Sequence, residues 1–305
     1  MSMPNACVIC GHQGKIRQIS TYKSNWYECA ACGNSWRELK PHFPLEFLSF
    51  ARRLGYLTRY ANSFSDLIGK KGSSVDHFRY YETLIKSGVR KHWARELQTV
   101  LEPFTSHGLN PDLHNKRVLD ISGEPGFFAQ DALERGAAEA AVTGFADNVV
   151  QCMRDHSKLD AHIFDYAKND IAEIFLGRTF DLIFVRFSIG YCCDLNEFFA
   201  SLKRILAPQG MLYVSFMPQS AAIYARWMFE DYTILRQYTP DFLQQRAAAH
   251  GLALQASWTW GTRPYYEGIP RTQHLLSLTY EQEIFQGADP SKILQKDIAF
   301  VFRHA

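Results

Sequence analysis

Four cysteines near the amino terminus stand in two pairs whose spacing suits a metal ion. Cys7 and Cys10 form a C-x-x-C pair followed by Gly11, and Cys29 and Cys32 repeat the pattern after 18 intervening residues. Each short loop brings two thiolates to one ion, and a glycine after each pair lets backbone amides approach the sulfurs. Four thiolates complete a tetrahedral coordination sphere, so the pattern predicts a structural rather than a catalytic zinc ion.

The residues around the cysteines predict a β-hairpin with arms at 15–19 and 25–28, and a further strand at 35–37. Such a small segment forms little apolar core, and zinc binding of about 10–16 kcal/mol would supply most of its folding free energy. Two roles stay open for this module, packing on its neighbour or binding nucleic acid, and we favour packing. The basic and aromatic side chains suited to binding nucleic acid are Lys15, Arg17, Lys23, Trp26, Tyr27, Trp36 and Arg37.

A second group of residues suits a ligand that needs close contact with the backbone. An apolar run at 117–122 contains Asp120 and leads into Ser122-Gly123-Glu124-Pro125-Gly126, after which a helical pattern begins. A strand that turns sharply into a helix places small residues and unpaired backbone amides next to a ligand. The stretch therefore predicts a binding loop at the carboxyl end of a buried strand.

The elements that would position this loop follow from the alternation of apolar runs and helical patterns after residue 116. Helical patterns at 127–135, 195–206, 219–236 and 240–250 separate seven apolar runs, at 117–122, 140–145, 161–165, 180–187, 210–216, 252–260 and 297–304. Such alternation predicts an α/β fold, with a doubly wound, mostly parallel seven-stranded sheet covered by helices on both faces.

These runs and the loop resemble class I S-adenosylmethionine (SAM)-dependent methyltransferases over roughly residues 116–216. The stretch 202–210, LKRILAPQG, is similar to the family's sequence before its fifth strand. The resemblance implies a Rossmann-like methyltransferase fold and SAM as the cofactor. It also implies that Asp120 and the loop ending in Gly126 lie under the methionine part of SAM. By the same resemblance Asp147 holds the ribose hydroxyls, and Asp165 and Tyr166 contact the adenine.

The loop departs from the family's usual pattern at several positions. Ser122 and Glu124 stand where the commonest loop has glycines, and Ala146 takes the usual place of the ribose-binding acid. A carboxylate at Glu124 attracts the sulfonium and amino groups of SAM. Arg186 is interpreted as a ligand of an anionic acceptor group or of the SAM carboxylate, or else as an ion-pair partner of Asp120 or Glu124.

Two residues are candidates for the acceptor side of the site. Tyr191 stands where the family often has histidine, which makes it the first candidate to face the methyl acceptor. His274 lies in the segment 261–286, which in the family commonly shapes the substrate pocket, and is considered as general base or as an ordinary surface or core histidine. Helical patterns at 44–104 are expected to cap the pocket.

Composition narrows the class of protein. The 305 residues are 47% hydrophobic and 21% charged, as in soluble globular proteins. No apolar run approaches the roughly 20 residues of a membrane helix, and the first residues lack a secretory signal, so a cytoplasmic address is expected. Residues 1–100 carry a formal charge of +8 and residues 101–305 of −6. Seven cysteines, an odd number, argue against a disulfide framework.

The sequence thus predicts a zinc ribbon at 1–40, a helical cap or linker at 41–114, and a methyltransferase domain at 115–305 with substrate-pocket elements near 217–296. The predicted function is SAM-dependent methylation of a small molecule, such as a sugar or natural-product intermediate. One alternative is an RNA base methyltransferase whose ribbon binds nucleic acid, which the basic first third favours and the acidic remainder opposes. The other alternative is a non-catalytic binding or scaffold protein on the same fold.

Overall fold

The computed structural model describes most of the chain, and the contacts divide it into two units. The described residues are 4–20, 24–39, 81–82, 84–88, 96–110, 112–145, 147–166, 168–192, 194–216, 236–264 and 294–305. One unit comprises Met1–Val75, Met217–Leu243 and Thr259–Ile298, and the other comprises Asp76–Phe216, Gln244–Trp258 and Ala299–Ala305. Of the predicted helical patterns at 44–104 and 219–236, residues 44–80 and 219–235 lie outside the described residues.

The first unit contains a four-stranded antiparallel sheet with the order β1-β2-β3-β9. Its strands are β1 (Ile16–Ser20), β2 (Ser24–Cys29), β3 (Ser35–Leu39) and β9 (Arg236–Gln237). Antiparallel pairing of Ile16 with Cys29 and of Ser20 with Asn25 confirms the predicted hairpin. The third strand pairs with the second from Ser24↔Leu39 to Glu28↔Ser35.

The fourth strand of this sheet comes from a distant part of the sequence. Ser35 pairs with Gln237 and Trp36 with Arg236. Just beyond, the backbone amide of Thr239 donates to Asn34 Oδ1 at 2.6 Å, and the Thr239 hydroxyl donates to the carbonyl of Cys32 at 3.3 Å. The second cysteine turn is therefore held by residues about two hundred positions later, which no local pattern indicated.

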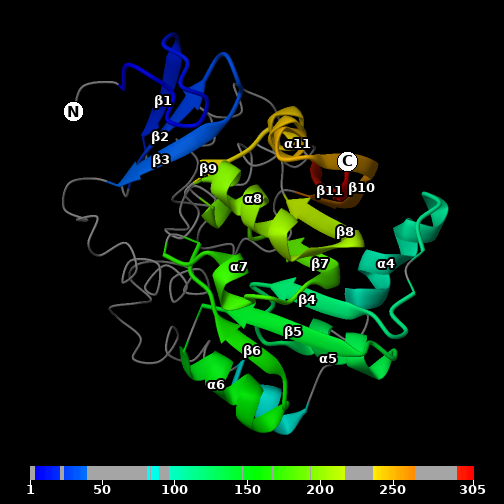
Figure 1. Ribbon diagram of the computed structural model, residues 1–305. Helices are drawn as coiled ribbons and strands as arrows, with labels where there is room; N and C mark the ends of the chain where they lie inside the picture. Colours follow the sequence, from blue (N-terminus) through cyan, green and yellow to red (C-terminus); the bar gives the residue numbers. More distant parts are fainter. Residues whose placement is uncertain are drawn as a thin grey trace. The chain divides into compact units, whose positions relative to one another are not determined.

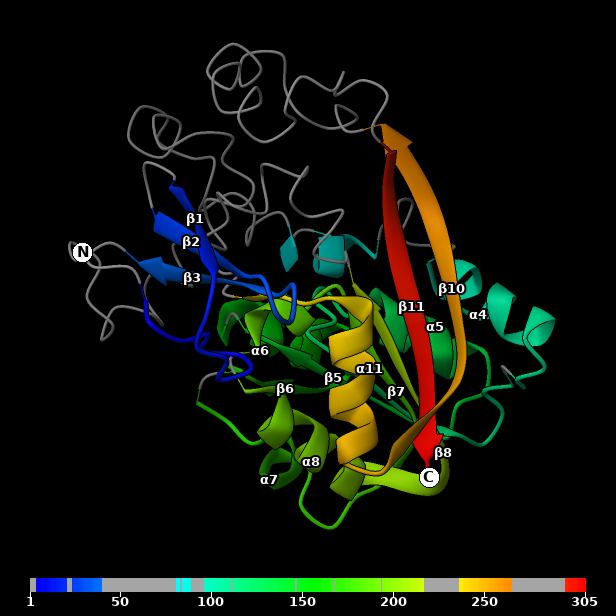
Figure 2. The same ribbon diagram turned by 90° about the horizontal axis from the view of Figure 1, so that it is seen from above.

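The second sheet has seven strands in the order β10-β11-β8-β7-β4-β5-β6. Five neighbouring strands pair in parallel (Figure 1). They are β4 (Arg117–Ile121), β5 (Glu139–Gly144), β6 (Asp160–Ile163), β7 (Phe180–Arg186) and β8 (Leu206–Phe216). At the edge beside β8, β10 (Leu252–Pro264) and β11 (Leu294–His304) run in opposite directions (Figure 2). The predicted seven-stranded, mostly parallel α/β fold is confirmed.

The order of the strands fixes where the helices lie. The chain moves along the sheet in one direction from β4 to β6 and in the other direction from β6 through β7 to β8. Because crossovers between parallel strands are right-handed, α5 (Phe127–Glu134) and α6 (Asp147–His156) cover one face of the sheet. The other face is covered by α7 (Ile171–Ile174) and α8 (Leu195–Ile205), and α4 (Glu96–Ser106) packs on α5. The direction changes between β4 and β7, where ligands bind in open α/β sheets.

Buried apolar side chains hold the central strands in place. Strand β7 has the sequence FDLIFVR, in which Phe180, Leu182, Ile183, Phe184 and Val185 are buried, as expected of a strand covered on both faces. The Asp194 carboxylate caps α8 by accepting from the amides of Asn196 and Glu197 at 2.8 and 3.1 Å. The buried positions of α8, among them Leu195, Phe198, Phe199 and Leu202, recur at helical spacing.

After β9 the chain forms α11 (Pro240–Ala249), close to the predicted helix at 240–250. Among the described helices, none combines the length and the apolar character that crossing a membrane requires.

Candidate active site at the carboxyl ends of the parallel strands

Asp120 and Arg186 form a buried ion pair across the two central strands. Arg186 Nη2 donates to Asp120 Oδ2 at 2.8 Å, and Arg186 Nε donates to Asp120 Oδ1 at 3.1 Å. The Asp120 side chain is fully buried, and the Arg186 guanidinium lies 4.1 Å from the ring centre of Phe128. Of the roles considered for Arg186, the structure contains the ion pair with Asp120, which joins the ends of β4 and β7.

The loop after β4 has the conformation that its glycines require. A Cβ atom on Gly123 would lie 1.9 Å from Asp120 Oδ2, so only glycine fits beside that buried carboxylate. Gly126 begins α5 with a φ of 89°, a left-handed conformation that favours glycine. Ser122 has a φ of 57°, and its amide donates to Thr143 Oγ1 at 2.9 Å. The loop therefore turns sharply against the end of β5.

Glu124 and Asp147 supply carboxylates near the end of β5 in different ways. Glu124 Oε1 accepts a hydrogen bond from the backbone amide of Phe145 at 2.9 Å. Asp147 is the first residue of α6 and is exposed. The carboxylate of Glu124, although it starts in the loop after β4, thus lies at the end of the neighbouring strand β5.

Tyr166 and Ser188 meet at the same edge of the sheet. The Tyr166 hydroxyl lies 2.8 Å from Ser188 Oγ, and Ser188, which follows β7, is buried. Burial raises the pKa of the Tyr166 phenol above its usual range, and hydrogen bonds with Ser188 and Ser122 oppose that rise. The contact links the segments that follow β6, β7 and β4. Ser188 was not among the predicted site residues, because a lone serine after a strand carries no signal in a single sequence.

Tyr191 and Asp165 lie close to this contact. Tyr191 belongs to the short 3-10 helix η2 (Ile189–Tyr191), is buried, and has its ring centre 6.2 Å from that of Tyr166. Asp165 is buried, and its amide donates to Asn169 Oδ1 at 2.9 Å. The structure therefore brings Asp165, Tyr166 and Tyr191 together near one edge, whereas His274 lies outside the described residues.

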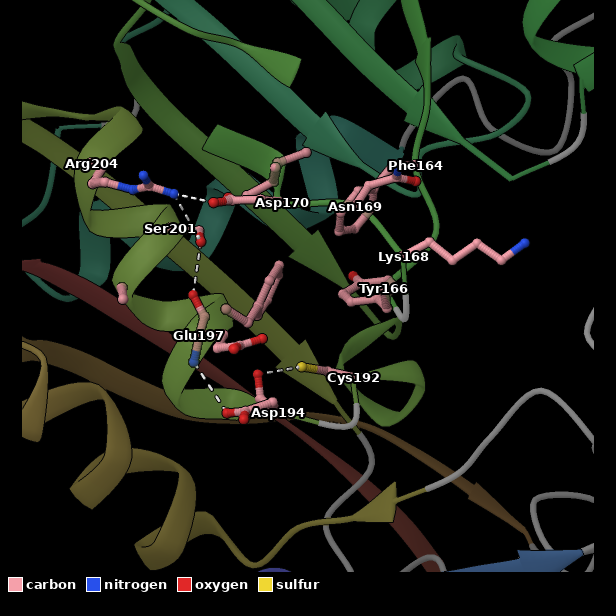
Figure 3. A pocket seen from close by; sticks show the side chains of 13 residues that line it. Phe164, Tyr166, Lys168, Asn169, Asp170, Cys192, Asp194, Glu197, Ser201 and Arg204 are labelled. Carbon is pink, nitrogen blue, oxygen red and sulfur yellow. Dashed lines mark hydrogen bonds and ion pairs between the residues drawn. The ribbon is translucent and has the colours of Figure 1, made fainter. Parts of the chain in front are cut away.

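A pocket of about 440 Å³ opens beside Tyr166, between the segment after β6 and α8 (Figure 3). Its wall combines aromatic rings, from Phe164, Tyr166 and Phe198, with polar groups that include Lys168 and Glu197. At its far end Arg204 is paired with Asp170, and Lys168 extends away from that pair (Figure 3). A cavity of this size accommodates a small organic molecule.

The four cysteines converge in the first unit. Their Sγ atoms all lie within 4.8 Å of one another, with Cys7 and Cys32 at 3.9 Å and Cys10 and Cys29 at 3.9 Å. The amides of the following glycines donate back to the carbonyls of Cys7 and Cys29, both at 2.8 Å. The spacing thus produces the compact sulfur cluster that a tetrahedral metal site requires.

The described aromatic rings of the ribbon are buried, and two of its arginines contact other side chains. Trp26, Tyr27 and Trp36 are at most 1% exposed, and the buried Arg37 guanidinium lies 4.8 Å from the ring centre of Trp26. Arg17 is exposed but pairs with Glu28 at 2.9 Å. Tyr27 and Trp36 pack with the cysteines in the ribbon's core, and Trp26 is buried on the other face of the strand, so none of the three rings can stack on bases.

The sequence matches one protein family over most of the second unit's described strands and helices. Residues 86–257, more than half of the chain, match the family described as the methyltransferase domain. The chain belongs to this methyltransferase family. It is accordingly an SAM-dependent methyltransferase, and the loop after β4 belongs to the matched region.

Solved structures share the fold at low sequence identity. The YcgJ protein of Bacillus subtilis is 15% identical with a TM-score of 0.51, over 68% of this chain and 98% of that one. A protein of Bacillus halodurans assigned as a methyltransferase is 14% identical with a TM-score of 0.51, over 69% and 99%. At such identities the likeness shows the fold alone. No curated protein matches the sequence.

Proposed function

We propose that this methyltransferase binds SAM at the carboxyl ends of β4, β5 and β7 and methylates a small molecule. The observation that carries the proposal is the loop after β4, which turns sharply at the topological switch point beside the buried Asp120–Arg186 pair. Gly123 fits the close contact with Asp120, and Gly126 has the left-handed φ that starts α5. These contacts fix the shape of the loop at the place where ligands bind in open α/β sheets.

The residues of this edge have distinct proposed roles. When bound, SAM supplies a methyl carbon activated by a positively charged sulfur. Asp120 and Arg186 fix the ends of β4 and β7, while Ser122, Gly123 and Gly126 shape the loop beneath the cofactor. Asp165 and Tyr166 are proposed to contact the adenine, and their segment also borders the pocket beside α8.

Tyr191 is proposed to face the methyl acceptor. It is buried, follows β7, and packs near Tyr166. A buried ring at this place excludes water and orients the acceptor, which is the main task of an enzyme that catalyses an in-line displacement. We also propose His274, which lies outside the described residues, as the general base.

A small-molecule acceptor agrees better with the structure than RNA does. Residues 101–305 carry a net charge of −6, which repels a polyanion, and the ribbon's aromatic rings are buried. The pocket beside Tyr166 has the size of a small organic ligand. A sugar or a natural-product intermediate is the acceptor class that we propose.

We also propose that Cys7, Cys10, Cys29 and Cys32 hold one structural zinc ion. Their sulfurs lie close enough to share one tetrahedral ion, and four protein ligands leave no position for a substrate. The ion would stabilise the β1-β2-β3-β9 sheet rather than take part in methyl transfer.

The acceptor class is tested by incubating the purified protein with SAM that carries a labelled methyl group. One reaction contains total cellular RNA, and the other contains a metabolite fraction freed of macromolecules. We expect label in the metabolite fraction and none in the RNA. Label recovered in RNA bases would contradict the small-molecule assignment and support the RNA alternative.

A further inference from the structure

The side chain of Glu124 bridges two neighbouring strand ends. It begins in the loop after β4, and its Oε1 atom accepts from the amide of Phe145, the residue that follows β5. This hydrogen bond of 2.9 Å fixes the carboxylate at the carboxyl end of β5. A carboxylate held by a backbone donor is positioned in advance for a ligand that donates hydrogen bonds.

Gly144 provides the space for this arrangement. A Cβ atom on Gly144 would lie 2.6 Å from both Cγ and Oε1 of Glu124. Gly144 does not have the left-handed φ found at Gly126, so its conformation does not require glycine. The glycine at the end of β5 and the glutamate in the loop are therefore complementary, and a larger residue at 144 would displace the carboxylate.

Asp147, the other carboxylate of this corner, has a different setting. It is exposed and occupies the first turn of α6, where a negative charge stabilises the helix through its dipole. That role at the start of the helix accounts for an acidic residue at this position. The carboxylate of Glu124, by contrast, is held at the end of β5 by the Phe145 amide and lies in the space left by Gly144.

We propose that Glu124, and not Asp147, supplies the carboxylate that accepts hydrogen bonds from the ribose hydroxyls of SAM. The inference rests on the proposed SAM site. Two vicinal hydroxyls are hydrogen-bond donors that suit one carboxylate, whose two oxygens offer about four acceptor positions, one of them taken by the Phe145 amide. A residue that departs from the usual glycine of the loop thereby compensates for Ala146, which stands where the family has its ribose acid.

The test is calorimetric titration with S-adenosylhomocysteine and with its analogue lacking both ribose hydroxyls. The proteins are the parent, Glu124→Gln and the matched variant Asp147→Asn. Glutamine keeps an oxygen that accepts from the Phe145 amide, and thermal unfolding verifies that each variant is folded. We expect Glu124→Gln to weaken S-adenosylhomocysteine binding about 10- to 100-fold, as expected for losing charged hydrogen bonds. The same variant should bind the analogue as the parent does.

The remaining outcomes separate this inference from the proposed function. Unchanged or tighter binding of S-adenosylhomocysteine by Glu124→Gln overturns the inference, as does a comparable loss for both ligands. A loss confined to Asp147→Asn returns the role to Asp147. If the parent protein itself fails to bind S-adenosylhomocysteine, the proposed SAM site is wrong, and the inference falls with it.

Discussion

The cysteine cluster and the loop after β4 both depend on glycine turns, but they are stabilised by different means. At the cysteine cluster, Gly11 and Gly33 have φ values of 75° and 68°, and the surrounding core is small. At the loop, Gly126 starts a helix that rests on fully buried strands, and Asp120 pairs with a residue 66 positions away. The comparison indicates that the cysteine cluster has only a small apolar core to stabilise it, whereas the loop rests on a large one.

The largest effect is expected from removing one thiolate of the cluster. Cys29→Ser should abolish stoichiometric zinc binding and expose the amides of β1 and β2 to hydrogen exchange, because metal binding contributes about 10–16 kcal/mol in small zinc modules. Zinc content by mass spectrometry and exchange rates measure both. Cys152→Ser removes a buried thiol outside the cluster and should keep one zinc per chain. One zinc per chain in both variants would contradict the assignment of Cys29 as a zinc ligand.

The next largest effect concerns the buried ion pair. Asp120→Ala removes the carboxylate that neutralises the Arg186 guanidinium, whose side chain is only 11% exposed. We expect a loss of about 3–5 kcal/mol in the free energy of unfolding, as measured in urea. Adding Arg186→Met should restore part of the loss, because it removes the uncompensated charge. A single variant as stable as the parent would mean that the pair does not join β4 to β7.

Much of this comparison could be predicted from sequence, and the exceptions have a physical reason. The cysteine pairs and the apolar runs are local patterns, so they predicted the cluster, the hairpin and the strands. Contacts across long separations leave no local signal. The pairing of β9 with β3, the contact of Tyr166 with Ser188, and the bond from Phe145 to Glu124 all belong to this class.

The roles of individual residues illustrate the same limit. The sequence allowed Arg186 to bind a ligand or to pair with an acid, and only the spatial arrangement of β4 and β7 shows its pairing with Asp120. The ribbon's aromatics had the composition of a nucleic-acid surface, yet Tyr27 and Trp36 form its core and Trp26 is buried as well. Residue types indicate which chemistry is available, but burial decides whether a partner can reach it.

A moderate loss of stability is expected from Gly126→Ala, and its comparison with a control separates backbone strain from tight packing in the loop. In Gly126→Ala the new Cβ would meet Leu159 Cδ1 at 2.6 Å and Met153 Sδ at 2.7 Å, in addition to the strain of a φ of 89°. Gly177→Ala is the matched control, since Gly177 has a φ of 77° with open space around it. The control should lose about 1–2 kcal/mol of unfolding free energy, and Gly126→Ala should lose more. Equal losses would contradict tight packing at the start of α5.

The smallest effect is expected at Asp160, the first residue of β6, which lies at the amino end of the parallel strands. Its hydrogen bond with His162, and another with Arg178, lower the pKa of Asp160 to about 2. A carboxyl whose pKa is lower in the folded protein stabilises the fold above its unfolded pKa of about 4, and this contribution disappears as the pH falls toward 2. Asp160→Asn should therefore flatten the stability profile between about pH 4 and 2, measured by thermal unfolding. An unchanged slope would show that the hydrogen bonds of Asp160 with His162 and Arg178 do not contribute to the stability of the fold.

The central claim is that the loop after β4 forms an SAM site, and the most direct test is calorimetric titration of the purified, zinc-loaded protein with S-adenosylhomocysteine. The structure predicts saturable one-to-one binding, which Gly126→Ala should weaken and Cys152→Ser should leave unchanged. Absence of binding at millimolar ligand, from a protein shown to be folded, would contradict the proposed site.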